Sequence, residues 1–106
     1  MIIDLNDNNF DQATSSGVTL VDFYADWCAP CKRMMPRVLS VAETLKGKVT
    51  VAKVNVDESR KIAAKFGVRS IPTFVLIEDG KVVDLAAGSK TEQDLLLFAE
   101  GRTRGA

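Results

Sequence analysis

Apolar residues in this chain fall into short runs and into stretches with helical spacing. Runs rich in β-branched and aromatic residues predict strands over 18–25, 49–56, 73–77 and 81–85, with a further strand over 1–5. Apolar side chains recurring every three or four positions predict helices over 30–45, 58–66 and 92–100, and a weaker one over 8–16. Residues 101–106 are expected to form a frayed tail.

The longest predicted helix, 30–45, has a continuous apolar side. We expect this side to face the core, and it carries Met34, Met35, Val38, Leu39, Ala42 and Leu45. Gly47 then ends the helix.

The order of these elements predicts an α/β fold. Two apolar strands joined through the helix 30–45 form a parallel pair with a right-handed crossover. The turn 78–80 is short enough to make the last two strands an antiparallel hairpin. A single mixed sheet of four to five strands, with helices on both faces, satisfies both conditions. The sequence shows no linker and no repeat, so residues 1–106 are expected to form one domain.

Composition narrows the classes of partner. The 106 residues include 14 basic and 14 acidic side chains, a formal net charge of zero. Without a basic surface, nucleic acid and membranes are not expected partners, and we expect a monomer. No apolar stretch approaches the roughly 20 residues that span a bilayer. The first residues lack the basic start and apolar segment of a secretory signal, so a cytoplasmic location is predicted.

The two cysteines, Cys28 and Cys31, lie where the strand 18–25 gives way to the longest helix. The free N–H groups at a helix start stabilise an anion, so the pKa of the Cys28 thiol is expected to be lowered. Pro30 suits the first helical position because its missing N–H has no partner there, and it stiffens the loop. The pattern predicts disulfide exchange, in which an exposed Cys28 attacks a foreign disulfide and a shielded Cys31 resolves the mixed disulfide.

Two other interpretations of the cysteine pair stay open, namely half of a zinc site and two inert core residues. A zinc site needs four ligands, and the chain has no histidine and no further cysteine. Only two copies sharing one ion would complete such a site. We therefore expect no bound metal or other cofactor, and the redox-active group is the Cys28–Cys31 disulfide.

Two charged residues interrupt strands that are otherwise fit for burial. Asp22 lies in the run 18–25, where an isolated carboxylate is costly, so its pKa is expected to rise. It is a candidate proton acceptor for Cys31, and the alternative is a structural carboxylate with hydrogen-bond partners. Lys53 interrupts the run 49–56. Its ammonium either approaches Asp22 and opposes the rise in pKa or extends to the edge of the sheet.

The segments 21–32, 53–57 and 69–74, together with Gly88, resemble the thioredoxin family in order and spacing over nearly the whole chain. The resemblance implies the thioredoxin fold and the reduction of disulfides in protein substrates. It also implies an NADPH-dependent flavoprotein reductase as electron donor. Asp22 resembles the family's buried carboxylate, which accepts the proton of the resolving cysteine. The resemblance further implies a cis bond between Ile71 and Pro72, which presents the backbone of Ile71 to an extended substrate strand.

Trp27 is the single tryptophan, and it precedes the nucleophile directly. It either packs in the core or forms part of a partly exposed docking surface. Further residues could extend this docking surface into an apolar patch that suits varied protein substrates. The candidates are Ala29, Pro30, Val68, Ile71, Pro72 and Gly88.

The chain departs from the family pattern at three positions. Ala29 and Ser70 stand where glycine is usual, and Tyr24 stands where tryptophan is frequent. Ala29 adds a methyl group and removes backbone freedom between the two thiols. Together with Pro30 and Pro72, it is expected to tune the redox potential. The leading prediction is a protein-disulfide reductase. The alternatives are a disulfide oxidase or isomerase, which often has histidine between the cysteines, and a thioredoxin-fold clamp or chaperone-like binding module.

Overall fold

The computed structural model describes residues 1–102, and it confirms the predicted order of elements. The strands are β1 (Ile3–Leu5), β2 (Val18–Tyr24), β3 (Thr50–Asn55), β4 (Thr73–Glu78) and β5 (Lys81–Ala87). The helices are α1 (Phe10–Ala13), α2 (Ala29–Thr44), α3 (Arg60–Lys65) and α4 (Glu92–Ala99). All but α1 agree with the predicted boundaries to within two residues. None of the helices in this range is long and apolar enough to cross a membrane.

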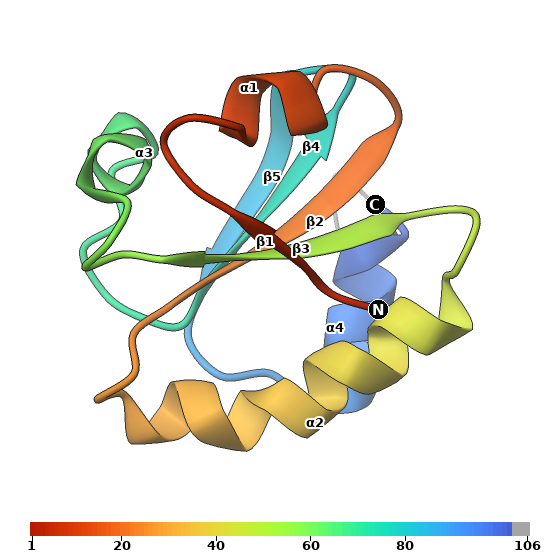
Figure 1. Cartoon of the computed structure of the whole chain (residues 1–106). Helices are drawn as coiled ribbons and strands as arrows, with labels where there is room; N and C mark the ends of the chain where they lie inside the picture. The colour runs from red at the N-terminus through yellow and green to blue at the C-terminus, as the bar shows by residue number, and fades with distance from the viewer. Residues whose placement is uncertain (103–106) are drawn as a thin grey trace.

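The strands form one mixed sheet in the order β1-β3-β2-β4-β5. Strands β2 and β3 are parallel and are connected through α2, as predicted, while β4 is antiparallel to β2. The β4–β5 hairpin turns at Asp79 and Gly80, which both have positive φ, 51° and 82°. That backbone suits a two-residue turn between twisted strands. Strand β2 is therefore the central strand, and the chain passes from its C-terminal end to the start of α2 (Figure 1).

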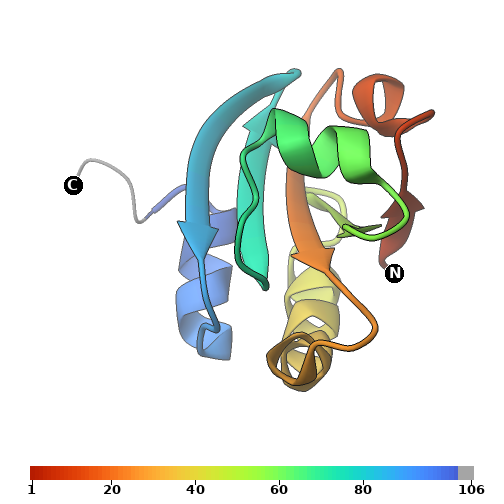
Figure 2. The ribbon, with the colours of Figure 1, turned by 90° about the vertical axis from the view of Figure 1, so that its left-hand side faces the viewer.

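Helices cover both faces of the sheet, which confirms the predicted layers. Helices α2 and α4 lie on one face, and α1 and α3 lie on the other (Figures 1 and 2). On the first face the largest buried side chains are Leu20, Met34, Phe74 and Leu95. On the second they include Phe10, Phe23 and Ile77. The two clusters enclose the sheet, and the cysteine pair lies beyond the C-terminal end of the central strand β2.

The apolar side of α2 differs from the predicted one at one position. Met34, Val38, Ala42 and Leu45 are buried as expected, and Met35 is half-buried, but Leu39 is 45% exposed. Val41 is buried in its place. At 3.6 residues per turn, the stripe through residues 34, 38, 41 and 45 faces the sheet, and residue 39 is rotated away from it.

Local hydrogen bonds explain why α1 is shorter than the predicted helix over 8–16. The side-chain oxygen of Asn6 accepts hydrogen bonds from the N–H groups of Asn8 and Asn9, at 2.8 and 3.1 Å. The side chain of Asn9 in turn accepts from the N–H of Asn6, at 2.7 Å. Such loops compete with helical hydrogen bonds, so the helix begins only at Phe10.

The start of the predicted frayed tail is ordered by a helix cap. The N–H of Gly101, with φ of 73°, donates to Phe98, and the N–H of Arg102 donates to Leu97. This pair of bonds closes the end of α4 in the way that glycine commonly does. Fraying is therefore wrong for these two residues, and the rest of the predicted tail, 103–106, lies outside the described residues.

Candidate functional site

Cys28 is the N-cap residue of α2. The chain leaves β2 after Tyr24, and Cys28 has the extended backbone typical of a cap, with φ of −89° and ψ of 104°. Its sulfur accepts a hydrogen bond from the N–H of Cys31, at 3.2 Å. Pro30 is the second residue of the helix rather than the first, because the helix begins at Ala29. It still removes no helical hydrogen bond, since the first four N–H groups of a helix have no intrahelical partner.

The two cysteines form a disulfide, and their Cα atoms are 5.3 Å apart. Both residues are buried in this oxidised form, with exposed fractions of 4% for Cys28 and 2% for Cys31. The expectation that Cys28 is exposed is therefore wrong for the disulfide state. The physical reason is apolar packing, because Tyr24, Val56 and Ile71 lie against the pair.

The loop before β4 brings a backbone acceptor to the disulfide. The Ile71–Pro72 bond is cis, as the resemblance implied. The carbonyl oxygen of Ile71 lies 3.8 Å from the sulfur of Cys28. Pro72 is buried, and its carbonyl accepts a hydrogen bond from the N–H of Gly88, at 2.8 Å. Two distant loops are thus joined beside the cysteines.

The candidate docking residues differ in where they lie. Trp27 is 70% exposed, which rules out the core alternative, and its Nε1 donates to Asp57 Oδ2 at 2.8 Å. Ala29 is also exposed, and Ile71 is half-buried beside the disulfide. Val68 packs instead against the core cluster on the α1–α3 face, so its place is at the margin of the site.

Asp22 is fully buried on the face of the sheet that α2 covers. Both carboxylate oxygens lack a hydrogen-bond partner among the backbone and side-chain groups of residues 1–102. Burial raises the pKa of Asp22 to about 7, and the positive charge of Lys53 opposes part of the rise. The carboxyl group therefore changes its protonation near neutral pH, where a general base is most effective.

Lys53 combines the two alternatives that the sequence left open. Its Nζ lies 3.6 Å from Asp4 Oδ1 on the edge strand β1, so its side chain extends to the sheet edge. Its charge nevertheless lowers the pKa of Asp22, because the two residues are neighbours in the β2–β3 register. The ammonium also lies 5.6 Å from the centre of the Tyr24 ring.

Three residues beside the site were not predicted as site residues, although Tyr24 was noted as a departure from the family pattern. Asp57 holds the indole of Trp27, Tyr24 packs against the disulfide, and Asp4 binds Lys53. A signal existed for Asp57, because it closes the segment 53–57 that resembles the thioredoxin family. Nothing in the sequence pattern marked Asp4, because its partner lies 49 positions further along the chain.

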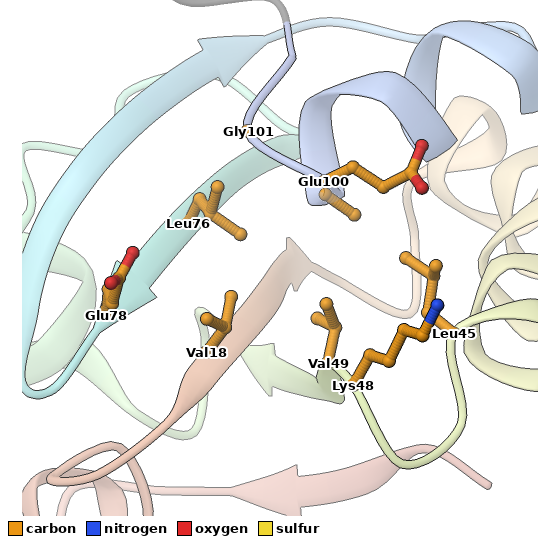
Figure 3. Close-up of a pocket in the computed structure, with 9 residues that line it drawn as sticks. Val18, Leu45, Lys48, Val49, Leu76, Glu78, Glu100 and Gly101 are labelled. Carbon is orange, nitrogen blue, oxygen red and sulfur yellow. The ribbon is translucent and has the colours of Figure 1, made fainter.

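Two cavities bear on the location of the chemistry. One of about 300 Å³ opens beside Cys31 and is lined by Tyr24, Ala25, Asp26, Cys31, Lys32 and Met35. Another, of about 250 Å³, lies near the C-terminal end of α2, where Val18, Leu45 and Val49 point inward (Figure 3). This second cavity contains no cysteine, and it lies at the other end of α2 from the disulfide. Within residues 1–102, no group of three or more metal-ligating side chains forms a metal site.

Comparison with known proteins agrees with this geometry. A sequence model of the thioredoxin family matches residues 1–100. The thioredoxin of Staphylococcus saprophyticus is 44% identical over 94 residues, which cover 89% of this chain and 90% of the relative. The chain belongs to the thioredoxin family. The thioredoxin of Bacillus subtilis is 39% identical over the same shares of the two chains.

A solved structure of the family has the same fold. A mutant thioredoxin from Halobacterium salinarum superposes with a TM-score of 0.86 and 38% identity, covering 98% of this chain and 92% of that one. Thioredoxins are thiol–disulfide oxidoreductases that use the cysteine pair itself and need no cofactor. This chain is accordingly a thiol–disulfide oxidoreductase of the thioredoxin fold that acts on disulfide-containing substrates.

Proposed function

We propose that the chain reduces the disulfides of other proteins, with Cys28 as the attacking thiol and Cys31 as the resolving thiol. The observation that carries this assignment is the position of Cys28 at the N-terminus of α2. Its sulfur receives the N–H of Cys31 and faces the positive end of the helix. These groups stabilise a thiolate on Cys28, which is the species that attacks a disulfide.

The reaction takes two exchange steps. The thiolate of Cys28 attacks one sulfur of the substrate disulfide, forming a mixed disulfide and releasing the other substrate sulfur as a thiolate. Cys31 then loses its proton and attacks the sulfur of Cys28, which forms the Cys28–Cys31 disulfide and releases the second substrate thiolate. Two electrons pass to the substrate, and the chain ends in the oxidised form described above.

Asp22 is the proposed acceptor of the Cys31 proton. It is buried on the face of the sheet under α2, and its pKa is raised to about 7. An acceptor with such a pKa is half ionised near neutral pH and basic enough to assist a thiol. Lys53 takes part by lowering the pKa of Asp22 through its charge. Neither Asp22 nor Lys53 forms a covalent bond with the substrate; only the cysteines do.

Substrates are proposed to dock on the surface around Trp27, Ala29, Pro30 and Ile71. The indole and the helix start supply apolar area, and the Ile71 carbonyl beside Cys28 can accept a hydrogen bond from an extended substrate chain. Pro72 and Gly88 hold this loop in place through their 2.8 Å hydrogen bond, and Val68 extends the surface at its margin. Ala29, Pro30 and Pro72 are proposed to tune the redox potential, because they shape the loops around the disulfide.

The proposed reaction needs a reductant in the cell. Each turnover oxidises the cysteine pair, so a reductant must restore both thiols. The proposed donor is an NADPH-dependent flavoprotein reductase, as the family resemblance implies. We place this reaction in a single domain over 1–106 that acts as a monomer in the cytoplasm, the compartment in which thiols are kept reduced.

The test is a pair of serine substitutions in an insulin-reduction assay with dithiothreitol. Cys28→Ser is expected to reduce the rate to that of dithiothreitol alone, because the attacking sulfur is gone. Cys31→Ser is expected to accumulate a covalent mixed disulfide with the substrate, visible by mass spectrometry and cleaved by excess reductant. The two variants are matched controls, since each removes one sulfur and leaves the same number of thiols.

Other outcomes would select the alternative functions. Trapping through Cys31 rather than Cys28 would contradict the assigned roles. Full biological function of the double variant Cys28→Ser, Cys31→Ser would indicate a clamp or chaperone-like module. Equilibration of the wild-type disulfide against a glutathione series would reveal an oxidase or isomerase by a potential well above that of reducing thioredoxins.

A further inference from the structure

Three charged residues form a row across three strands. Lys53 on β3 is in register with Asp22 on β2 at one side and with Asp4 on β1 at the other. Side chains at paired positions of neighbouring parallel strands point to the same face of the sheet. Leu20 and Val51, two positions earlier on β2 and β3, belong to the core cluster under α2 and α4. The row therefore lies on that face, with its inner end buried and its outer end at the edge strand.

The ammonium group of Lys53 is held at the outer end of this row. Its Nζ lies 3.6 Å from Asp4 Oδ1, and it lies over the Tyr24 ring at 5.6 Å. The side chain of Lys53 is 29% exposed and that of Asp4 is 78% exposed, so the contact lies near solvent. Both oxygens of Asp22 lack any hydrogen-bond donor within residues 1–102. One cation thus stands between two carboxylates and contacts only the exposed one.

We propose that Asp4 is a positioning residue of the redox site: it holds Lys53 at the sheet edge and so keeps Asp22 free to accept a proton near neutral pH. The proposal rests on the role of Asp22 given above. It adds a residue that touches neither the cysteines nor Asp22, and it assigns the exposed Asp4–Lys53 pair a function beyond stability.

The ammonium of Lys53 would act differently beside the exposed Asp4 and beside the buried Asp22. An exposed ion pair is worth little for stability, so Asp4 adds little to folding. The same ammonium beside a buried carboxylate would act with much less screening, because the interaction takes place away from water. Lys53 already lowers the pKa of Asp22 from the edge of the sheet. A closer approach would leave Asp22 ionised throughout the neutral range and make it a weaker base.

The other charged and titratable groups around the row are few. Tyr24 follows Asp22 by two positions on β2, and its pKa is raised by burial first and then by Asp4, Asp26 and Glu58, while a hydrogen bond from Asn55 opposes the rise. Cys31 on α2 is held in the disulfide and does not titrate, and the residue of β4 opposite Asp22 is the apolar Phe74. Asp4 is therefore the carboxylate that both contacts Lys53 and acts on its neighbour Tyr24.

The first test measures the ionisation of Asp22 by carbon NMR of its carboxyl group, in the oxidised protein where neither cysteine titrates. Asp4→Asn is expected to lower the pKa of Asp22 by about one unit. Roughly half a unit of this is the direct loss of a charge about 10 Å away, two strand spacings across the sheet, and the rest is the closer approach of Lys53. Asp4→Glu is expected to restore the wild-type curve. Asp11→Asn is the matched control, because Asp11 also pairs with an exposed lysine, Lys65, at 3.5 Å.

The second test asks whether Asp4 influences Asp22 through Lys53. In a Lys53→Met background the Asp4→Asn change is expected to keep only its direct share of the shift in the pKa of Asp22, roughly half a unit. In the insulin assay, Asp4→Asn is expected to raise the rate at pH 6, where a larger fraction of Asp22 is ionised, and to lower it at pH 8, where Asp22 is ionised in both proteins but is the weaker base in the variant.

Two results would overturn the proposal. One is an Asp22 titration that is the same in Asp4→Asn as in wild type or Asp11→Asn. The other is an Asp4→Asn effect of undiminished size without Lys53, which would mean that the cation is not the intermediary. Both measurements are independent of whether Asp22 serves as the proton acceptor. That role fails separately, if Asp22→Asn leaves the pH profile of the resolving step unchanged.

Discussion

The buried carboxylate of Asp22 links the chemistry of the site to the stability of the protein. Its pKa in the folded protein is raised to about 7 from 3.8, with burial as the main cause. Between about pH 4 and pH 7 the folded protein therefore keeps a proton that the unfolded chain has released. Stability falls as pH rises through this window and levels off above it. The total loss is roughly 4 kcal/mol, from 1.36 kcal/mol for each pH unit.

Replacing Asp22 by asparagine removes this ionisation. Asp22→Asn is expected to be more stable than wild type at pH 8, by about 4 kcal/mol, and nearly equal to it at pH 4. Urea unfolding of the oxidised proteins at pH 4, 6 and 8 measures the difference. Asp11→Asn, a change at an exposed carboxylate, provides the control. Parallel stability curves for wild type and Asp22→Asn would show that the buried carboxylate is not the source of the pH dependence.

Several single residues could be identified from the sequence because their chemistry conflicts with their surroundings. Asp22 and Lys53 interrupt apolar strands, and Cys28 and Cys31 open a helix. The burial of Asp22 and the cis bond before Pro72 are confirmed. Their roles in the reaction stay predictions. The burial of Cys28 was missed, because it depends on packing by residues from other parts of the chain.

The helices differ in which groups accept hydrogen bonds from the N–H groups of their first turns. The N-terminus of α4 is capped locally, by the hydroxyl of Thr91, which accepts from the N–H of Asp94 at 3.0 Å. Helix α3 has no side-chain cap from its own N-cap residue Ser59. Its first N–H groups are instead bound by Asp7, which accepts from Lys61 at 3.3 Å and from Ile62 at 2.9 Å. A residue before α1 thus fixes a helix more than fifty positions later.

If Asp7 caps α3, removing its carboxylate should destabilise that helix. Asp7→Ala is expected to lower the free energy of unfolding by about 1 kcal/mol, the usual loss for a helix cap, and to increase hydrogen exchange in α3 before other elements. Urea unfolding and amide exchange measure the two effects. Asp11→Ala removes a carboxylate with only an exposed lysine partner, so its effect should stay below about 0.5 kcal/mol. Equal losses in both variants would contradict the capping role.

The boundaries of most elements were predictable because the signals are local. Period-two and period-3.6 patterns, glycine stops and the proline near the start of α2 all act within a few residues. The exception is α1, where Asn6 and Asn9 form competing hydrogen bonds. Side-chain loops of this kind depend on rotamers that residue type alone does not specify.

The two ends of α2 have different surroundings: the cysteines lie at its start, and apolar core residues surround its end. Cys28 caps the start of the helix, and Leu45 caps its end, roughly 25 Å away by the helical rise. Leu45 is buried and lines the cavity of Figure 3 with Val18, Val49 and Leu76. Changes at this end of the helix act on packing alone, because no group of the redox site lies there.

Leu45→Ala is therefore expected to destabilise the protein by about 2–3 kcal/mol while leaving the insulin-reduction rate per folded molecule unchanged. Leu39→Ala on the same helix is the matched control. Leu39 is 45% exposed, so its loss should be below about 1 kcal/mol. Urea unfolding and the reductase assay on the same samples separate the two quantities. A loss of specific activity in Leu45→Ala would show that packing at this end reaches the active site.

Local chemistry in the sequence was sufficient for the α/β class, the order of elements and the cysteine pair at a helix start. These properties follow from periodicity and from residue types a few positions apart. Folding was required to bring the Ile71 carbonyl to Cys28, Asp57 to Trp27 and Asp4 to Lys53. Such contacts depend on strand order and register, and a shift of one residue would turn each strand residue to the opposite face. The ionisation of Asp22 belongs to this second group, because it depends on how completely other elements exclude water from it.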